Sequence, residues 1–197
     1  MRKLIVSEFL SFDGVMQAPG GVDEDTDGGF AHGAWFIPYW HDDIGGYFTE
    51  TLSQCDTLLL GRKTYETYAR AWPPRAGVDG YADRMNSIPK HVVSTTLTRP
   101  AWHNSTVISE DIATAIDRLK AQPGGDILVF GSGKLVVYLM QHDLVDEYHL
   151  LIYPVVLGHG QRLFPTGSSM NLQRIASQLF PSGVMGLLYR SALLARP

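Results

Sequence analysis

One short segment, Leu58–Glu66 (LLLGRKTYE), constrains the fold more than any other part of the chain. An apolar run ends at a glycine, and two cations and a hydroxyl lead directly into helix-forming residues. This order predicts a buried strand, a tight turn and a helix N-terminus. Such an N-terminus has unpaired N–H groups and a partial positive charge, so Arg62, Lys63 and Thr64 are placed to bind an anion, most simply a phosphate. The alternative is that the cations form a solvated turn and that Thr64 only caps the helix.

A second glycine turn, Gly131-Ser132-Gly133-Lys134, follows the apolar run Asp126–Phe130 and precedes another predicted helix. Glycines at such a turn let the backbone approach a phosphate closely. The turn is not a P-loop, because Leu128 and Leu135 stand where that motif needs a glycine and a hydroxyl, and it is not a Rossmann fingerprint, because Val136 replaces the third glycine. It therefore predicts either a generic phosphate or cofactor cradle or merely a tight turn.

Strand and helix patterns alternate along most of the chain. Strands are predicted at 3–10, 57–60, 91–94, 106–108, 126–130, 145–156, 171–179 and 184–194, and helices at 42–54, 63–69, 79–85, 110–121 and 135–141. The alternation predicts an α/β fold with a central, mainly parallel twisted sheet and helices on both faces. The consecutive final strands predict an antiparallel C-terminal edge. We find no repeat or break in composition, so we expect a single domain over residues 1–197.

Composition excludes several classes of protein. The formal net charge of -4 gives no support to a nucleic-acid surface. The one cysteine, Cys55, lies beside an apolar strand and is expected to be buried rather than reactive. The seven histidines show no metal-binding spacing, so we expect no metal site. No apolar run is long enough to span a membrane and the N-terminus lacks the features of a signal peptide, so a cytoplasmic protein is expected.

The segment from Gln17 to Gly33 is too polar and rich in glycine for a helix or a core strand, and a loop of this length is usually functional or disordered. Aromatic residues follow it directly, from Trp35 to Trp40. Because a cluster of exposed aromatics would be costly, these side chains are expected to pack on the core, line a pocket or meet a partner chain.

Taken together, these stretches resemble the dihydrofolate reductase-like superfamily, and within it the reductase domain of the bifunctional riboflavin-biosynthesis deaminase/reductase and its stand-alone bacterial relatives. The resemblance covers essentially the whole chain. It rests on residues 2–16 with Ser-Phe-Asp-Gly at 11–14, on 56–65, 91–95 and 127–134, and on Val-Asp-Glu-Tyr-His-Leu at 145–150 with Pro-Val-Val-Leu-Gly at 154–158.

The resemblance implies a dihydrofolate reductase-like fold that binds NADPH. By analogy, the first glycine turn would hold the adenosine 2′-phosphate and the pyrophosphate, residues leaving the next strand would lie beside the same phosphate, and the second turn would face the pyrophosphate and the nicotinamide ribose. The matching positions here are Gly61, Arg62, Lys63, Thr64, Ser94, Thr95, Gly131, Ser132, Gly133, Lys134 and Leu135.

The same resemblance suggests where the substrate binds. The loop after the first strand would cover the nicotinamide, so the residues from Asp13 to Gln17 would line the active site. Asp43 falls near the position of the carboxylate that assists protonation in dihydrofolate reductases; if it is buried, it could pair with a donor-rich heterocycle. Asp13 and Asp43 are thus the candidate catalytic residues. The candidate substrate wall consists of Gln17, Trp35, Phe36, Trp40 and Tyr153, although these aromatics could equally be core or dimer interface.

The expected function is that of an NADPH-dependent oxidoreductase, similar to 5-amino-6-(5-phosphoribosylamino)uracil reductase and dihydrofolate reductase. It would transfer a hydride to a small heterocyclic, carbonyl or imine substrate of pyrimidine- or pterin-like type. The alternative is a non-catalytic module on the same fold that binds a nucleotide or another small ligand, or serves in protein interactions. The resemblance also implies a homodimer.

Overall fold

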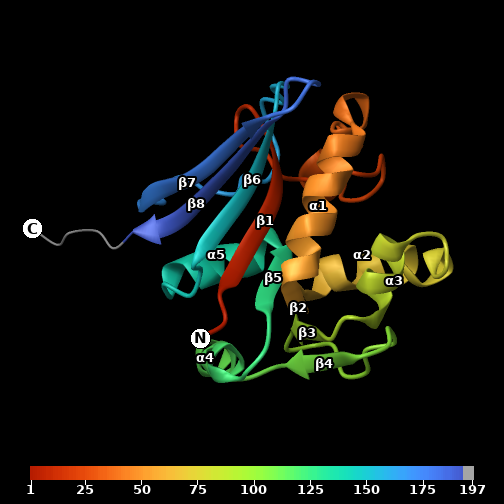
Figure 1. Cartoon of the computed structure of the whole chain (residues 1–197), viewed down its shortest axis with the longest axis vertical. Helices are drawn as coiled ribbons and strands as arrows, with labels where there is room; N and C mark the ends of the chain where they lie inside the picture. Colours follow the sequence, from red (N-terminus) through yellow and green to blue (C-terminus); the bar gives the residue numbers. More distant parts are fainter. Residues whose placement is uncertain (193–197) are drawn as a thin grey trace, which may run out of the picture. The chain divides into compact units, whose positions relative to one another are not determined.

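The computed structural model describes residues 1–192 (Figure 1). The chain divides into two compact units. Unit 1 comprises Met1–Ile5 and Tyr47–Leu144, and unit 2 comprises Val6–Gly46 and the described residues from Val145 onward. Strand β1 and helix α1 each run from one unit into the other. The expectation of a single domain stays a prediction.

The strands form one eight-stranded sheet in the order β4-β3-β2-β5-β1-β6-β8-β7. Its strands are β1 (Leu4–Ser11), β2 (Cys55–Gly61), β3 (Lys90–Val93), β4 (Ser105–Ile108), β5 (Asp126–Phe130), β6 (Glu147–Tyr153), β7 (Asn171–Leu179) and β8 (Met185–Ala192). The sheet is mainly parallel with an antiparallel C-terminal edge, which confirms the predicted fold class. The last two residues of the strand predicted at 184–194 lie outside the described residues.

The helices are α1 (Asp42–Gln54), α2 (Arg62–Ala71), α3 (Gly80–Ser87), α4 (Ile112–Ala121) and α5 (Gly133–Gln141), with short 3-10 turns η1 (Asp27–Gly29), η2 (Ile37–Tyr39) and η3 (Pro73–Arg75). Helix α1 has the predicted bounds. Strand β6 ends at Tyr153 rather than at residue 156, because Pro154 has no N–H to continue the ladder. Helices α2 and α5 begin one and two residues earlier than predicted, so each starts immediately at its glycine turn.

Four neighbouring parallel strands, β4-β3-β2-β5, form the centre of unit 1. The three leucines at 58–60 are fully buried, as are Ile127 and Leu128 on β5. Helix α2 packs against β2 and β3, and α5 packs against β2. Because β2 and β5 are adjacent and parallel, their carboxyl ends lie at the same edge, and each leads directly into a helix. The topology therefore brings the two glycine turns together.

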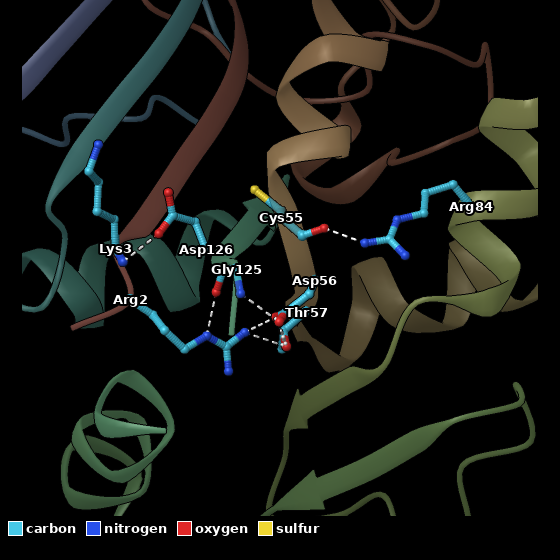
Figure 2. Close-up of polar contacts among 8 residues, drawn as sticks. All are labelled: Arg2, Lys3, Cys55, Asp56, Thr57, Arg84, Gly125 and Asp126. Atoms are coloured by element: carbon cyan, nitrogen blue, oxygen red, sulfur yellow. Dashed lines mark hydrogen bonds and ion pairs between the residues drawn. The ribbon is translucent and has the colours of Figure 1, made fainter. Parts of the chain in front are cut away.

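A polar network joins the amino ends of the same strands (Figure 2). The buried Arg2 guanidinium donates to the carbonyl of Gly125, to the Asp56 carboxylate and to Thr57 Oγ1, and Asp56 also accepts the Gly125 N–H at 2.7 Å. This network lies at the opposite end of β2 from the glycine turn, so its role is to hold the N-terminal residues to β2 and β5.

Cys55 lies beside this network and is buried, as predicted. Burial, with the nearby carboxylates of Asp126 and Asp56, raises the pKa of the thiol to about 12. The thiol therefore stays protonated and unreactive near neutral pH.

The antiparallel strands β6, β8 and β7 belong to unit 2. Tyr148 and Tyr153 of β6 are fully buried, whereas nearly all of the edge strand β7 is exposed. The long polar segment after β1 is held by its own side chains. Glu24 accepts the N–H groups of Gly20 and Gly21 at 2.7 and 3.1 Å, and partial burial raises its pKa despite these bonds.

Candidate functional site

The two glycine turns of unit 1 are joined by reciprocal hydrogen bonds. The Gly61 N–H donates to Ser132 Oγ at 3.0 Å, and the Ser132 N–H donates to Thr64 Oγ1 at 2.9 Å. Gly131 has a φ of +56°, and a Cβ at this position would lie 3.3 Å from the Thr64 side chain. Glycine at 131 therefore suits both the left-handed backbone conformation and the close approach of Thr64.

Two helix N-termini meet at these turns. Gly61, which caps α2, has no side chain to make a capping bond. Ser132, which caps α5, makes none either, because its hydroxyl donates to the Phe130 carbonyl at 3.1 Å. The N-termini of both helices, with their unpaired N–H groups and positive dipole ends, therefore lie next to each other. The Thr64 hydroxyl accepts from Ser132 and can still donate its own hydrogen to an anion.

Arg62 extends this site toward the end of β3. Its Nε donates to Glu66 Oε1 at 2.7 Å, and its Nη1 donates to Thr96 Oγ1 at 2.6 Å. The Arg62 side chain is about half exposed, at 49%. A guanidinium held in this way by a carboxylate on its own helix and by a hydroxyl on the next loop is a suitable partner for a phosphate.

The residues predicted after β3 have different roles. Ser94 is buried, and its hydroxyl accepts the N–H groups of Thr96 and Leu97, so it shapes the turn. Thr95 is exposed. Thr96, which the sequence analysis did not select, makes the contact with Arg62. The signal that could have found it is the third hydroxyl of the run Ser94-Thr95-Thr96, directly beyond the strand that pairs with β2.

The other residues of the second turn also have different roles. Gly133 is the first residue of α5, Lys134 is exposed, and Leu135 is buried with its side chain against Gly61. Leu135 is thus a packing residue of the turn whose backbone N–H, rather than its side chain, belongs to the helix N-terminus.

An aromatic cluster in unit 2 surrounds Tyr153. The ring centroids of Trp35 and Phe9 lie 5.4 and 5.5 Å from that of Tyr153, both nearly edge-to-face, and Phe36 and Tyr39 lie at 6.1 Å. Trp40 packs against Phe36 and is 48% exposed. The structure thus brings together four of the five residues predicted for the substrate wall, and it adds Phe9, which stacks on Phe36 at 5.1 Å. Phe9 reads as an ordinary strand residue, and no sequence signal distinguishes it.

Gln17, the fifth residue predicted for the substrate wall, organises the loop. Its side chain donates to the carbonyls of Asp25 and Asp27 and accepts the Gln161 N–H, while its own carbonyl accepts Trp35 Nε1–H at 2.8 Å. The amide is therefore engaged in holding the loop, and a direct contact between Gln17 and a substrate stays a prediction.

Asp13 is bound to the segment that follows β6. Its carboxylate accepts the Ser11 hydroxyl at 2.7 Å and the N–H groups of Leu157 and Gly158 at 3.1 and 2.9 Å, and it pairs with Arg162 at 3.6 Å. Desolvation raises the pKa of Asp13, but the hydrogen bonds from Ser11, Leu157 and Gly158 outweigh it and lower the pKa to about 2. At neutral pH Asp13 is thus an ionised acceptor and is not suited to donate a proton.

Asp43 lies in the first turn of α1, where its carboxylate is 3.3 Å from His41 Nδ1. Its side chain is 57% exposed. The burial on which its proposed pairing with a heterocycle depends is therefore not found. A carboxylate at this position stabilises the helix N-terminus, which is the simpler interpretation of the Asp42-Asp43 pair.

Within residues 1–192, no group of three or more histidine, cysteine or carboxylate side chains is arranged to hold a metal ion. In the same residues, we find no helix with the length and apolar character that a membrane span requires.

The sheet, with its antiparallel C-terminal edge, has the dihydrofolate reductase-like fold. A solved structure of a protein assigned by its name to riboflavin biosynthesis, from Shewanella sp. PV-4, matches with a TM-score of 0.67 and 20% identity over 97% of this chain and 99% of that one. A pyrimidine reductase-like protein from Corynebacterium diphtheriae matches with a TM-score of 0.66 and 12% identity over 98% and 92% of the two chains.

The chain belongs to the RibD C-terminal domain family, whose model matches residues 2–185. The uncharacterised proteins YyaP and YwjB of Bacillus subtilis (strain 168) are relatives of similar length. YyaP is 30% identical over 192 residues, which are 95% of this chain and 94% of YyaP, and YwjB is 28% identical over 164 residues, 83% of each. The family supports an oxidoreductase-like role.

Proposed function

We propose that the protein is an NADPH-dependent reductase of a small planar substrate. The observation that carries the proposal is the pair of glycine turns, joined through Ser132 and Thr64, at which α2 and α5 both begin. Two helix N-termini at one edge of a parallel sheet form a binding site for the pyrophosphate of a dinucleotide.

Arg62 is the proposed determinant of NADPH over NADH. A guanidinium suits a dianionic phosphate, and Arg62 is already directed toward the loop after β3 by its hydrogen bond to Thr96. Lys63 adds a second positive charge at the start of α2. NADH has no 2′-phosphate, so it would gain nothing from this charge.

The aromatic cluster of unit 2 is the proposed substrate site. Phe9, Trp35, Phe36 and Tyr153 offer ring faces and edges that suit a flat heterocycle or a conjugated carbonyl or imine. The nicotinamide would supply the hydride, and the chain would supply binding and orientation. We assign no proton-donating role to Asp13 or Asp43.

The test is a fluorescence titration of the wild type and of Arg62→Ala with NADPH and, in parallel, with NADH. We expect the wild type to prefer NADPH, and the variant to lose about tenfold or more in NADPH affinity with little change for NADH, because a charge-assisted hydrogen bond contributes about 1.5–3 kcal/mol. Equal losses for both nucleotides would refute the 2′-phosphate assignment. Failure of the wild type to bind either one would refute the reductase proposal.

A second candidate is a protein that binds a ligand without catalytic turnover. It is favoured because neither of the two predicted catalytic carboxylates is suited to donate a proton. Asp13 is ionised and held by the chain, and Asp43 is exposed. Hydride transfer does not itself require an acid, so the reductase remains the better proposal. Loss of NADPH absorbance with pyrimidine, pterin or quinone substrates would separate the two, since a binding module predicts none with any of them.

We further propose a cytoplasmic homodimer. The edge strand β7 exposes Ile175 and Leu179, which gives a second copy an apolar edge to cover. Light scattering after size-exclusion chromatography measures the mass directly.

A further inference from the structure

The hydroxyl of Tyr153, at the carboxyl end of β6, is buried and has no hydrogen-bond partner among residues 1–192. The side chain is 0% exposed. Burial also raises the pKa of Tyr153, so the group stays a neutral hydroxyl that can donate. A buried polar group without a partner lowers the stability of the folded state, so its presence in a core position calls for an explanation.

Two other polar side-chain groups of the aromatic cluster make hydrogen bonds within unit 2. Trp35 Nε1–H donates to the Gln17 carbonyl at 2.8 Å, and the Tyr39 hydroxyl donates to the Pro154 carbonyl at 3.3 Å. Tyr153 lies at the centre, with the rings of Phe9, Trp35, Phe36 and Tyr39 around it. Phenylalanine would keep these ring contacts without the unpaired oxygen, so packing alone does not account for a tyrosine.

None of residues 36–40, which include the Phe36 and Tyr39 rings against Tyr153, is buried. Residues 36–40 contain the short turn η2, which has no buried residue, and Ile37 and Trp40 are 51% and 48% exposed. Trp35, by contrast, is buried and bonded to the Gln17 carbonyl. Displacement of Phe36 and Tyr39 would make the Tyr153 hydroxyl accessible to a ligand, which could then stack on the ring of Phe9.

Building on the proposed function, we propose that the Tyr153 hydroxyl donates a hydrogen bond to the carbonyl oxygen or imine nitrogen of a planar heterocyclic substrate. The rings of the cluster accept any flat molecule of suitable size, and the hydroxyl selects those with an acceptor at one edge. A site that holds a buried donor discriminates strongly against ligands that leave it unpaired. Tyr153 is thus a specificity-determining residue, and its unpaired state without ligand is the cost of that selectivity.

The experiment compares the wild type, Tyr153→Phe and Tyr148→Phe by isothermal titration calorimetry with lumazine, a flat pteridine with two carbonyl acceptors. Tyr148 is the matched control, because it lies on the same strand, is equally buried and points to the opposite face of the sheet. We expect Tyr153→Phe to weaken lumazine binding about tenfold or more, and Tyr148→Phe to leave it within about twofold.

Thermal unfolding without ligand gives an independent result. Because Tyr153→Phe removes an unpaired buried hydroxyl, its melting temperature should be at least that of the wild type, with an increase of up to about 2–4 °C. Unchanged lumazine affinity in Tyr153→Phe, or no binding of lumazine to the wild type at millimolar concentration, would overturn the proposal. A clear fall in the melting temperature of Tyr153→Phe would also overturn it, because the hydroxyl would then have a structural partner.

The same variants are titrated with NADPH. The nucleotide reports on the proposed cofactor site of unit 1. If none of the three proteins binds NADPH, the reductase assignment is refuted. The lumazine result would still decide whether Tyr153 recognises a heterocycle.

Discussion

Thr64 couples the two glycine turns, and replacing it with valine tests whether that coupling builds the cofactor site. Valine keeps the shape of threonine but removes the acceptor for the Ser132 N–H, which now lies 2.9 Å from Thr64 Oγ1. An unpaired buried N–H costs about 1–3 kcal/mol. Ser132 is only partly buried, so water can reach part of the site, and we expect Thr64→Val to lose about 1–2 kcal/mol of unfolding free energy.

The effect on the nucleotide should exceed the effect on stability alone. If the turn at Ser132 shifts, the N-terminus of α5 no longer lies next to that of α2, and NADPH affinity should fall about tenfold or more. Urea unfolding gives the first quantity and fluorescence titration the second. Thr64→Ser is the matched control, because it keeps the hydroxyl and removes only the methyl group that packs against Gly131.

The coupling argument requires Thr64→Ser to retain nearly all of the NADPH affinity. If valine and serine weaken NADPH binding equally, the methyl contact rather than the hydrogen bond positions the turn. If neither variant changes the affinity, the two turns do not form one site.

Two further substitutions separate structure from binding. Arg2→Met should lower the unfolding free energy by about 2–4 kcal/mol, because it leaves Asp56 without its buried cation. NADPH affinity should stay unchanged, because the network lies at the opposite end of β2 from the glycine turn. A large loss of NADPH affinity in folded Arg2→Met would contradict this. Asp13→Asn should cost about 1–2 kcal/mol at pH 7, after allowance for solvent screening of a side chain that is 18% exposed. Because the folded-state pKa of Asp13 lies below its value of 3.8 in the unfolded chain, this stabilisation is complete above about pH 4 and disappears as the pH falls toward 2. Wild type and variant should therefore converge in stability over that window, and a constant difference down to pH 2 would show that the carboxylate charge is not the cause.

The strand–turn–helix units could be predicted because their information is local. An apolar run, a glycine and a following polar helix appear as such in the sequence at Gly61 and at Gly131. Their meeting in space follows from the pairing of β2 with β5. The resemblance to a known superfamily implied that both turns bind one cofactor, but composition and periodicity alone would not have established the pairing of the two strands.

The contacts that the sequence analysis missed are those that depend on a distant partner. The sequence shows Phe9 only as an aromatic residue in a strand, and its role depends on stacking with Phe36. Likewise, Thr96 is only a hydroxyl in a loop, and its role depends on the hydrogen bond from Arg62. Glu24 could not be assigned for the same reason, since its partners are backbone N–H groups of its own loop. Residue type does not indicate which of several possible partners a side chain will have.

Asp13 shows how the same limitation affects chemistry. A carboxylate in the loop after the first strand has the right residue type for acid–base catalysis, but its pKa is determined by three donors, two of which lie about 145 residues away along the chain. Those donors stabilise the charged form and so make Asp13 a structural anchor for the segment after β6. Because Asp13 is held by these bonds and Asp43 is exposed, the proposed recognition of a substrate rests on the aromatic cluster and on the buried hydroxyl of Tyr153.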